Sequence, residues 1–217
     1  MVTIDEIIND IEHPNNRYDE RIKYLQKKNL NTSIIQKGVN DVERVIDEGA
    51  KSFVIYGEPQ SGKTEVMIAL TCKLLDKGFR TIFIVMNDNT ELENQNFERF
   101  QNSREINPSP LRDSELKDFS ENQLKQDVQR VIFCRKNSKN LEKCIQNTRH
   151  MKKRIIIDDE ADYATPDRNI NKQKEATQIN KKVGQLGQVE SDGVYIGVTA
   201  TPGRLDLNNT YLNDSTK

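Results

Sequence analysis

Hydrophobic residues in the first 48 positions recur at the spacing of amphipathic helices. One helical pattern ends at residues 13–16 (HPNN), and a second, short pattern carries Ile22 and Leu25. A third covers residues 33–48, where one face is formed by Ile35, Val39, Val42 and Ile46. Apolar residues at this period predict helices with one buried face. We therefore expect residues 1–48 to form a helical N-terminal extension.

From residue 49 to residue 217 the pattern changes to short β-branched runs that alternate with helical stretches. The predicted strands cover residues 52–56, 81–86, 131–134, 154–157 and 194–198. The predicted helices between them cover residues 63–77, 138–150 and about 171–186, and Gly78 stands where a helix C-terminus favours glycine. Strands that alternate with helices predict an α/β fold with a mostly parallel sheet and helices on both faces.

Residues 88–130 are the least regular part of this second region. They are rich in Asn, Gln, Glu and Ser, and Pro108 and Pro110 interrupt them. Such composition predicts loops more readily than regular elements. We expect a solvated polar excursion with one or two helices and no strand of the sheet.

Composition narrows the class of protein. Hydrophobic residues make up 34% and charged residues 31% of the chain, and no apolar run approaches the roughly 20 residues of a membrane helix. The N-terminus lacks the pattern of a signal peptide. We expect a soluble, cytoplasmic protein without a membrane partner. A net charge of −1 excludes binding to nucleic acid through bulk charge, so any such contact must be local.

The cysteines and histidines do not suggest a metal site. Cys72, Cys134 and Cys144 lack the spacing of metal ligands, and we interpret them as reduced, partly buried thiols. His13 and His150 have no companion ligands nearby in the sequence and are interpreted as surface residues.

A phosphate-binding loop follows the first predicted strand. The segment matches G-x-x-x-x-G-K-[ST] at every fixed position and consists of Gly57, Glu58, Pro59, Gln60, Ser61, Gly62, Lys63 and Thr64. In such a loop the backbone N–H groups and the following helix N-terminus face the phosphates. Lys63 is expected to reach the β- and γ-phosphates, and Thr64 to ligate Mg²⁺. A chance glycine-rich turn is the alternative, but the flanking strand and helix argue against it.

The fourth long strand ends in a cluster of carboxylates, Asp158, Asp159, Glu160 and, beyond Ala161, Asp162. The carboxyl ends of parallel strands meet at one edge of a sheet, where the phosphate loop also begins. Asp159 is therefore a candidate Mg²⁺ ligand, and Glu160 a candidate base for the attacking water. A solvated acidic turn is the alternative.

A third segment, Thr199-Ala200-Thr201-Pro202, follows the last predicted strand. Together the three segments resemble motifs I, II and III of superfamily-two helicases, and the resemblance extends from about Ser33 to Arg204. It implies a RecA-like lobe that binds ATP and Mg²⁺. It also implies that Asp162, Thr199 and Thr201 couple the nucleotide to nucleic acid.

Gln36 lies upstream of the phosphate loop, where that superfamily carries a glutamine that reads adenine. A glutamine amide can pair with both N6 and N7 of adenine. An ordinary surface glutamine remains the alternative at this position.

A narrower resemblance is to the Z-one domain group, which is associated with restriction and nuclease systems. It rests on residues 131–141 (VIFCRKNSKNL), on the acidic cluster and on residues 179–180 ahead of the third segment. The sequence departs from the family after the second strand. Family members often place proline or arginine there against the nucleic-acid backbone, whereas this chain has Asn87, Asp88 and Asn89.

Nucleic-acid contacts are predicted at the exit of the third long strand, at Arg135, Lys136, Asn137 and Ser138. Asn137 or Ser138 can cap the following helix, whose N-terminus favours a phosphate. An ordinary capped helix with solvated charges is the alternative. We expect DNA in preference to RNA as the partner.

The sequence thus predicts the ATP-hydrolysing motor lobe of a helicase-like, nucleic-acid-dependent ATPase. The arginine fingers of the resembling family lie on a second RecA-like lobe, which we expect a further lobe or a partner subunit to supply. The 217 residues alone are then expected to bind nucleotide but to hydrolyse it slowly. The alternatives are the ATPase of a viral DNA-packaging terminase and a non-catalytic nucleotide-binding module.

Overall fold

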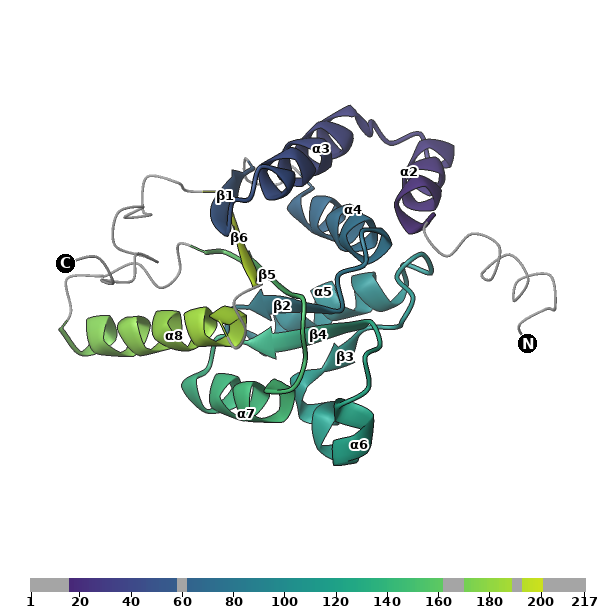
Figure 1. Cartoon of the computed structure of the whole chain (residues 1–217). Coiled ribbons are helices and arrows are strands. Elements are labelled where there is room, and N and C mark those ends of the chain that lie inside the picture. The colour runs from purple at the N-terminus through teal and green to yellow at the C-terminus, as the bar shows by residue number, and fades with distance from the viewer. Residues whose placement is uncertain (1–15, 58–61, 162–169, 189–192, 201–217) are drawn as a thin grey trace.

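A computed structural model describes residues 16–57, 62–161, 170–188 and 193–200 of the chain (Figure 1). The helices are α2 (Arg17–Lys27), α3 (Ser33–Asp47), α4 (Lys63–Asp76), α5 (Thr90–Gln101), α6 (Glu121–Leu124), α7 (Ser138–Thr148) and α8 (Ile170–Gln188), with a 3-10 helix, η1, at Asp113–Asp118. The strands are β1 (Ser52–Tyr56), β2 (Thr81–Met86), β3 (Leu111–Arg112), β4 (Arg130–Arg135), β5 (Arg154–Asp159) and β6 (Val194–Thr199).

The described strands form one parallel sheet of the α/β class predicted from the sequence. Its strand order is β1-β6-β5-β2-β4-β3, and every pairing is parallel. The five predicted strands and the helices α3, α4, α7 and α8 all occur within two residues of the predicted bounds, and α2 carries Ile22 and Leu25 as predicted. Because β6 lies between β1 and β5, the phosphate-loop strand and the acidic strand are separated by one strand.

Apolar side chains cover both faces of the sheet. On β2, Ile82 and Ile84 face a cluster that includes residues of α2, α3, α4 and α5, whereas Phe83 and Val85 face a cluster with residues of α7, α8 and η1. Figure 1 shows α2, α3 and α4 on one side of the sheet and α7 and α8 on the other. Burial on both sides explains why these strands are continuous apolar runs.

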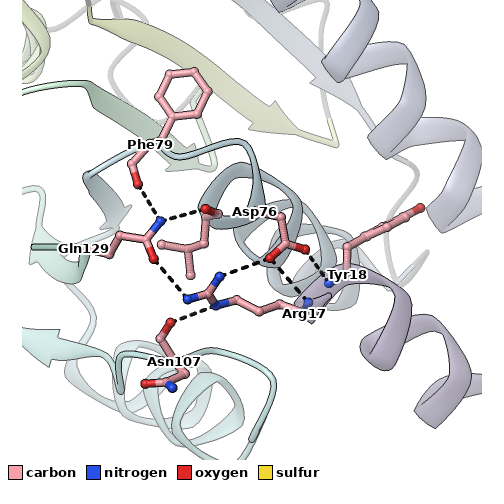
Figure 2. A network of polar contacts seen from close by, with 7 residues as sticks. Arg17, Tyr18, Asp76, Phe79, Asn107 and Gln129 are labelled. Carbon is pink, nitrogen blue, oxygen red and sulfur yellow. Dashed lines mark hydrogen bonds and ion pairs between the residues drawn. The ribbon is translucent and has the colours of Figure 1, made fainter. Parts of the chain in front are cut away.

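The helix α2 is tied to α4 by polar contacts as well as by its apolar face. Asp76, the last residue of α4, accepts hydrogen bonds from the backbone N–H groups of Arg17 and Tyr18 at 3.3 and 2.9 Å. It also pairs with the Arg17 guanidinium at 3.1 Å. The same guanidinium also donates hydrogen bonds to the Asn107 carbonyl and to the side-chain oxygen of Gln129 (Figure 2). One carboxylate therefore caps α2, which lacks a side-chain cap from Asn16.

The prediction for residues 88–130 was wrong in two respects. The segment contains a strand, β3, which pairs with β4 through Leu111 and Arg112. It is also partly buried, because Phe97 and Phe100 of α5 pack edge-on against Phe133 with ring centroids 5.1 and 5.0 Å apart. Two aromatic rings at helical spacing outweigh the polar residues around them, since each ring removes a large apolar area from water.

The three cysteines are free and more deeply buried than predicted. Cys134 and Cys144 lie with their Sγ atoms 3.0 Å apart in the cluster beneath α7. Burial raises the pKa of the Cys72 and Cys134 thiols well above the ordinary value. Among the described residues, no helix has the length and apolar character needed to cross a membrane.

Candidate nucleotide site

Three adjacent strands bring the three sequence motifs to the same edge of the sheet. Tyr56, the last residue of β1, pairs with Thr199 of β6, and Val198 of β6 pairs with Asp159 of β5. The chain continues this contact beyond the strands, because the Gly57 N–H donates to the Thr199 carbonyl at 3.0 Å. Since neighbouring strands lie about 4.8 Å apart, β1 and β5 end about 10 Å from each other, which is a span that a triphosphate can bridge.

The end of the phosphate loop is the start of α4. Gly62 occupies the position before the helix with φ of 80°, a left-handed conformation that glycine adopts without steric cost. Lys63 and Thr64 are the first two residues of α4, so their backbone N–H groups belong to the helix end that lacks intrahelical partners. Residues 58–61, which include Glu58, Pro59, Gln60 and Ser61, lie outside the described part of the chain.

Thr64 is held by a residue of α5. Its hydroxyl group donates to Oδ1 of Asn96 at 3.1 Å. A hydroxyl whose hydrogen is directed to an acceptor keeps its oxygen lone pairs available to a cation. The contact therefore turns the Thr64 oxygen into a suitable ligand for a hard cation.

Asp158 belongs to the core and not to the open edge. It is 3% exposed, and its carboxylate pairs with Lys136 Nζ at 2.7 Å and accepts the Tyr195 hydroxyl at 2.8 Å. A buried carboxylate with a cation and a hydroxyl partner is compensated in place. Of the described members of the acidic cluster, Asp159 is half-buried and Glu160 is exposed, so these two are accessible at the open edge.

Asp159 is half-buried, and its electrostatic environment is unfavourable for a charge. Burial and the neighbouring charge of Glu160 raise the pKa of Asp159 to about 6, although Lys136 and Lys63 oppose that rise. Lys63, at the start of α4, is thus among the charges that act on Asp159. A divalent cation beside Asp159 would favour its ionised form.

Glu160 follows β5 as an exposed residue with a left-handed backbone, with φ of 52°. Its backbone N–H donates to Oδ1 of Asp159 at 3.1 Å. Its carboxylate accepts a hydrogen bond from the side-chain amide of Asn87, which follows β2. The next residue, Ala161, returns to the sheet by donating to the Val198 carbonyl at 3.0 Å. These contacts place the Glu160 carboxylate at the open edge.

The remaining predicted site residues divide into three groups. Thr199 is buried at the end of β6. Asp162 and Thr201 lie outside the described residues. Gln36 lies half-exposed on α3, where its side-chain oxygen accepts the Thr32 hydroxyl at 3.3 Å, and its role with adenine stays a prediction.

The exit of β4 is more closely connected to the acidic strand than the sequence suggested. Asn137 caps α7 by accepting the Lys139 N–H at 3.0 Å, as predicted, and donates from Nδ2 to Asp88 at 3.0 Å. Arg135 lies 3.8 Å from the same carboxylate, and Ser138 begins α7. Lys136 is 3% exposed and points into the site, so its predicted contact with nucleic acid does not fit its place in the fold.

Two residues of this edge, Asn87 after β2 and Asn96 on α5, were not predicted as site residues because they lie outside the motifs, and Lys136 after β4 was predicted with another role. Each of the three contacts a motif residue. The rule that strand ends share one edge could have found Asn87 and Lys136, because both follow a predicted strand directly. Asn96 left no comparable signal in the sequence.

The comparison with protein-family models gives one match. The model of the type III restriction enzyme, res subunit, matches residues 16–204, which include α2 and extend beyond β6. A search among curated proteins finds no match. The match covers all three motifs and most of the chain, and it starts at α2, not at the strand that precedes the phosphate loop. The chain therefore belongs to the family of the type III restriction enzyme res subunit, a group of RecA-like, helicase-type ATPase lobes of superfamily two.

Proposed function

We propose that this chain binds ATP with Mg²⁺ and hydrolyses ATP in response to nucleic acid. One observation carries the proposal: the strand register brings the ends of β1, β6 and β5, which the three sequence motifs follow, to one edge of the sheet. Family membership supports the helicase-like class of ATPase. The site residues then take the roles that their chemistry allows.

The phosphates are bound by the loop from Gly57 to Thr64 in this proposal. Glu58, Gln60, Ser61 and Gly62 would supply backbone N–H groups, whereas Pro59 has none and would only shape the loop; the N-terminus of α4 favours the negative charge. Lys63 supplies the side-chain cation at the β- and γ-phosphates. Gln36, on α3, is proposed to read the adenine edge through its amide.

Thr64 and Asp159 would hold Mg²⁺. Both offer oxygen atoms, which Mg²⁺ prefers, and the raised pKa of Asp159 reflects burial first and the charge of Glu160 second, both of which a cation would offset. When bound, Mg²⁺ would neutralise negative charge that develops on the phosphate groups. Asn96 supports this set by fixing the hydrogen of the Thr64 hydroxyl.

Glu160 is proposed as the general base. Its carboxylate is exposed at the edge next to Asp159, where a water could lie against the γ-phosphate. Glu160 would orient that water and accept its proton as the water oxygen attacks phosphorus. The γ-phosphate then leaves as inorganic phosphate, and the electron pair of the broken bond stays on ADP.

Nucleic acid is proposed to bind at the exit of β4. Arg135, Asn137 and Ser138 lie there, at the N-terminus of α7, and DNA is the expected partner. Thr199, with Asp162 and Thr201, would couple this contact to the nucleotide. A second RecA-like lobe or a partner subunit is proposed to supply the arginine that stabilises the transferred phosphoryl group. Membership of the narrower Z-one group belongs to this proposal as well.

Turnover with and without nucleic acid tests the proposal. Steady-state ATP hydrolysis is measured at fixed low salt, first alone and then with single-stranded DNA, double-stranded DNA or RNA of equal length. The expected result is magnesium-dependent turnover that rises when DNA is added and rises less with RNA. Turnover that does not respond to any nucleic acid would contradict the coupling, and absence of hydrolysis under all conditions would contradict the enzyme assignment.

A further inference from the structure

Lys136 holds the backbone of the acidic strand end from the neighbouring part of the sheet. It follows β4 directly, and its backbone N–H donates to the Met86 carbonyl of β2 at 2.7 Å. Its Nζ donates to the carbonyl oxygens of Asp159 and Glu160, both at 2.8 Å, and pairs with Asp158 at 2.7 Å. One cation thus contacts three consecutive residues of the segment that contains the proposed base.

The burial of Lys136 indicates that its ammonium group contacts the acidic strand end and not nucleic acid. The residue is 3% exposed, so its ammonium cannot reach a phosphate backbone outside the fold. A buried ammonium is costly unless hydrogen bonds and a counter-charge compensate it. Asp158 and the two carbonyls provide that compensation. The position of Lys136 is therefore specified by the acidic strand end.

Asn87 contacts the same segment from β2. Its Nδ2 donates to the Glu160 carboxylate. Its Oδ1 is buried and has no hydrogen-bond partner among the residues that the structure describes, which is uncommon for an amide oxygen. The strand order places β2 between β5 and β4, so Asn87 and Lys136 reach Glu160 from two neighbouring strand ends.

We propose that Lys136 and Asn87 are positioning residues for ATP hydrolysis, which fix the backbone and the carboxylate of Glu160 from the ends of β4 and β2. This inference rests on the proposed role of Glu160 as the base. Lys136 sets the path of the chain at residues 159–160, and Asn87 selects the orientation of the Glu160 side chain. Neither residue touches ATP or nucleic acid in this assignment.

The backbone of Glu160 explains why such support is needed. A non-glycine residue with a left-handed φ is uncommon, and it persists only where the surroundings determine it. Glutamate also has three side-chain torsions, so an exposed carboxylate populates several orientations unless a partner selects one. A base displaced by about 1 Å can lose on the order of 100-fold in rate.

The test for Asn87 is single-turnover hydrolysis, with the protein in excess over radiolabelled ATP. The variant is Asn87→Ala, and the matched control is Asn102→Ala, which removes an exposed asparagine at the end of α5. We expect the rate constant of Asn87→Ala to fall about tenfold or more, with the dissociation constant for ATP within about twofold of the parent. An unchanged or increased rate constant would overturn the role of Asn87.

Lys136 needs a variant that does not leave a buried charge unpaired. Lys136→Met combined with Asp158→Asn removes both charges, while the asparagine oxygen can still accept the Tyr195 hydroxyl. Lys143→Met on the exposed side of α7 is the matched control. Circular dichroism and thermal unfolding establish that each variant is folded before the rates are compared.

Positioning and nucleic-acid contact give different results for this double variant. We expect slower single-turnover hydrolysis, by about tenfold or more, with ATP and DNA dissociation constants close to those of the parent. Normal hydrolysis with weakened DNA binding would overturn the inference and restore Lys136 as a nucleic-acid contact. If parent protein and Glu160→Gln hydrolyse ATP at the same rate, the proposed function itself fails, which is a different result from unaffected positioning variants.

Discussion

At the residue scale, Asp159 shows how a carboxylate that is proposed to bind Mg²⁺ can lower the stability of the nucleotide-free protein. Its folded-state pKa of about 6 lies above the ordinary 3.8, so the folded protein binds this proton more tightly than the unfolded chain. The free energy of unfolding therefore decreases as pH rises from about 4 to about 6, and the loss is complete above the folded-state pKa. Ionised Asp159 therefore lowers the free energy of unfolding at neutral pH, and a bound cation would offset this loss.

Asp159→Asn is therefore expected to stabilise the nucleotide-free protein at neutral pH. A shift of about two pKa units corresponds to at most ~3 kcal/mol, and partial exposure reduces this to about 1–2 kcal/mol. Urea unfolding with a chelator present measures the difference at pH 7.5 and at pH 4.5. The gain should largely vanish at pH 4.5, and a destabilised variant at pH 7.5 would contradict the account.

Glu160 is expected to separate binding from chemistry. Glu160→Gln preserves the shape of the side chain and its capacity to accept from Asn87, but the amide cannot take a proton from water. ATP–Mg²⁺ affinity should stay close to that of the parent, while hydrolysis falls by about 10²–10⁴-fold. Glu91→Gln, at an exposed position in the first turn of α5, is the control. Equal losses of affinity and rate would argue against a role as base.

At the scale of elements, the sequence predicted the strands that are buried on both faces. Residues 82–86 and 155–157 are continuous apolar runs because helices cover both sides of β2 and β5. The short strand β3 gave no such signal, since it has two residues at the border of the described sheet. Its Arg112 is positioned by tertiary contacts, with Glu93 at 3.1 Å and over the Phe97 ring at 3.8 Å.

Asp76→Ala tests how α2 is fixed to the body of the molecule. The change removes the acceptor for two backbone N–H groups of α2 and the partner of Arg17. We expect a loss of about 1–3 kcal/mol in the free energy of unfolding. Asp41→Ala, whose side chain is 56% exposed and 4.0 Å from Arg44, should change it by less than about 0.5 kcal/mol. Equal effects of the two changes would contradict the capping role.

Asp88 is expected to limit binding of nucleic acid at the exit of β4. Its carboxylate accepts from Asn137 and lies beside Arg135, the groups proposed to meet phosphate. Asp88→Asn should tighten DNA binding a fewfold and steepen its dependence on salt, because one more cation becomes available to the backbone. Fluorescence anisotropy at several salt concentrations measures both, with the exposed Asp118→Asn as control. Weaker binding by Asp88→Asn would argue against this contact surface.

At the scale of the whole molecule, the site depends on strand order more than on any single motif. The motif residues could be predicted, since each carries its own pattern and follows a predicted strand. Asn87 and Lys136 could be placed near this edge because each follows a predicted strand, but their contacts with Glu160 require β2 to lie between β5 and β4. The contact of Asn96 requires α5 to supply a partner for Thr64. Spacing along the chain does not contain that information.

The N-terminal helices α2 and α3 pack as part of the same hydrophobic core as the sheet. Residues of α2 and α3 share one apolar cluster with α4 and the sheet, and Arg21 of α2 pairs with Glu65, which directly follows Thr64. The family match likewise begins at residue 16. A division of the chain at residue 49 would therefore separate elements that pack together and that reach the nucleotide site.

Binding of ATP–Mg²⁺ by calorimetry tests the central claim most directly, because every proposed role depends on one nucleotide site at this edge. The parent chain should bind about one ATP per chain and require Mg²⁺. Lys63→Ala should weaken binding by at least about 10–100-fold, since it removes a charged hydrogen-bond donor to the phosphates, whereas the exposed Lys152→Ala should bind as the parent does. Equal affinity of Lys63→Ala and the parent, or no binding by either, would contradict the account.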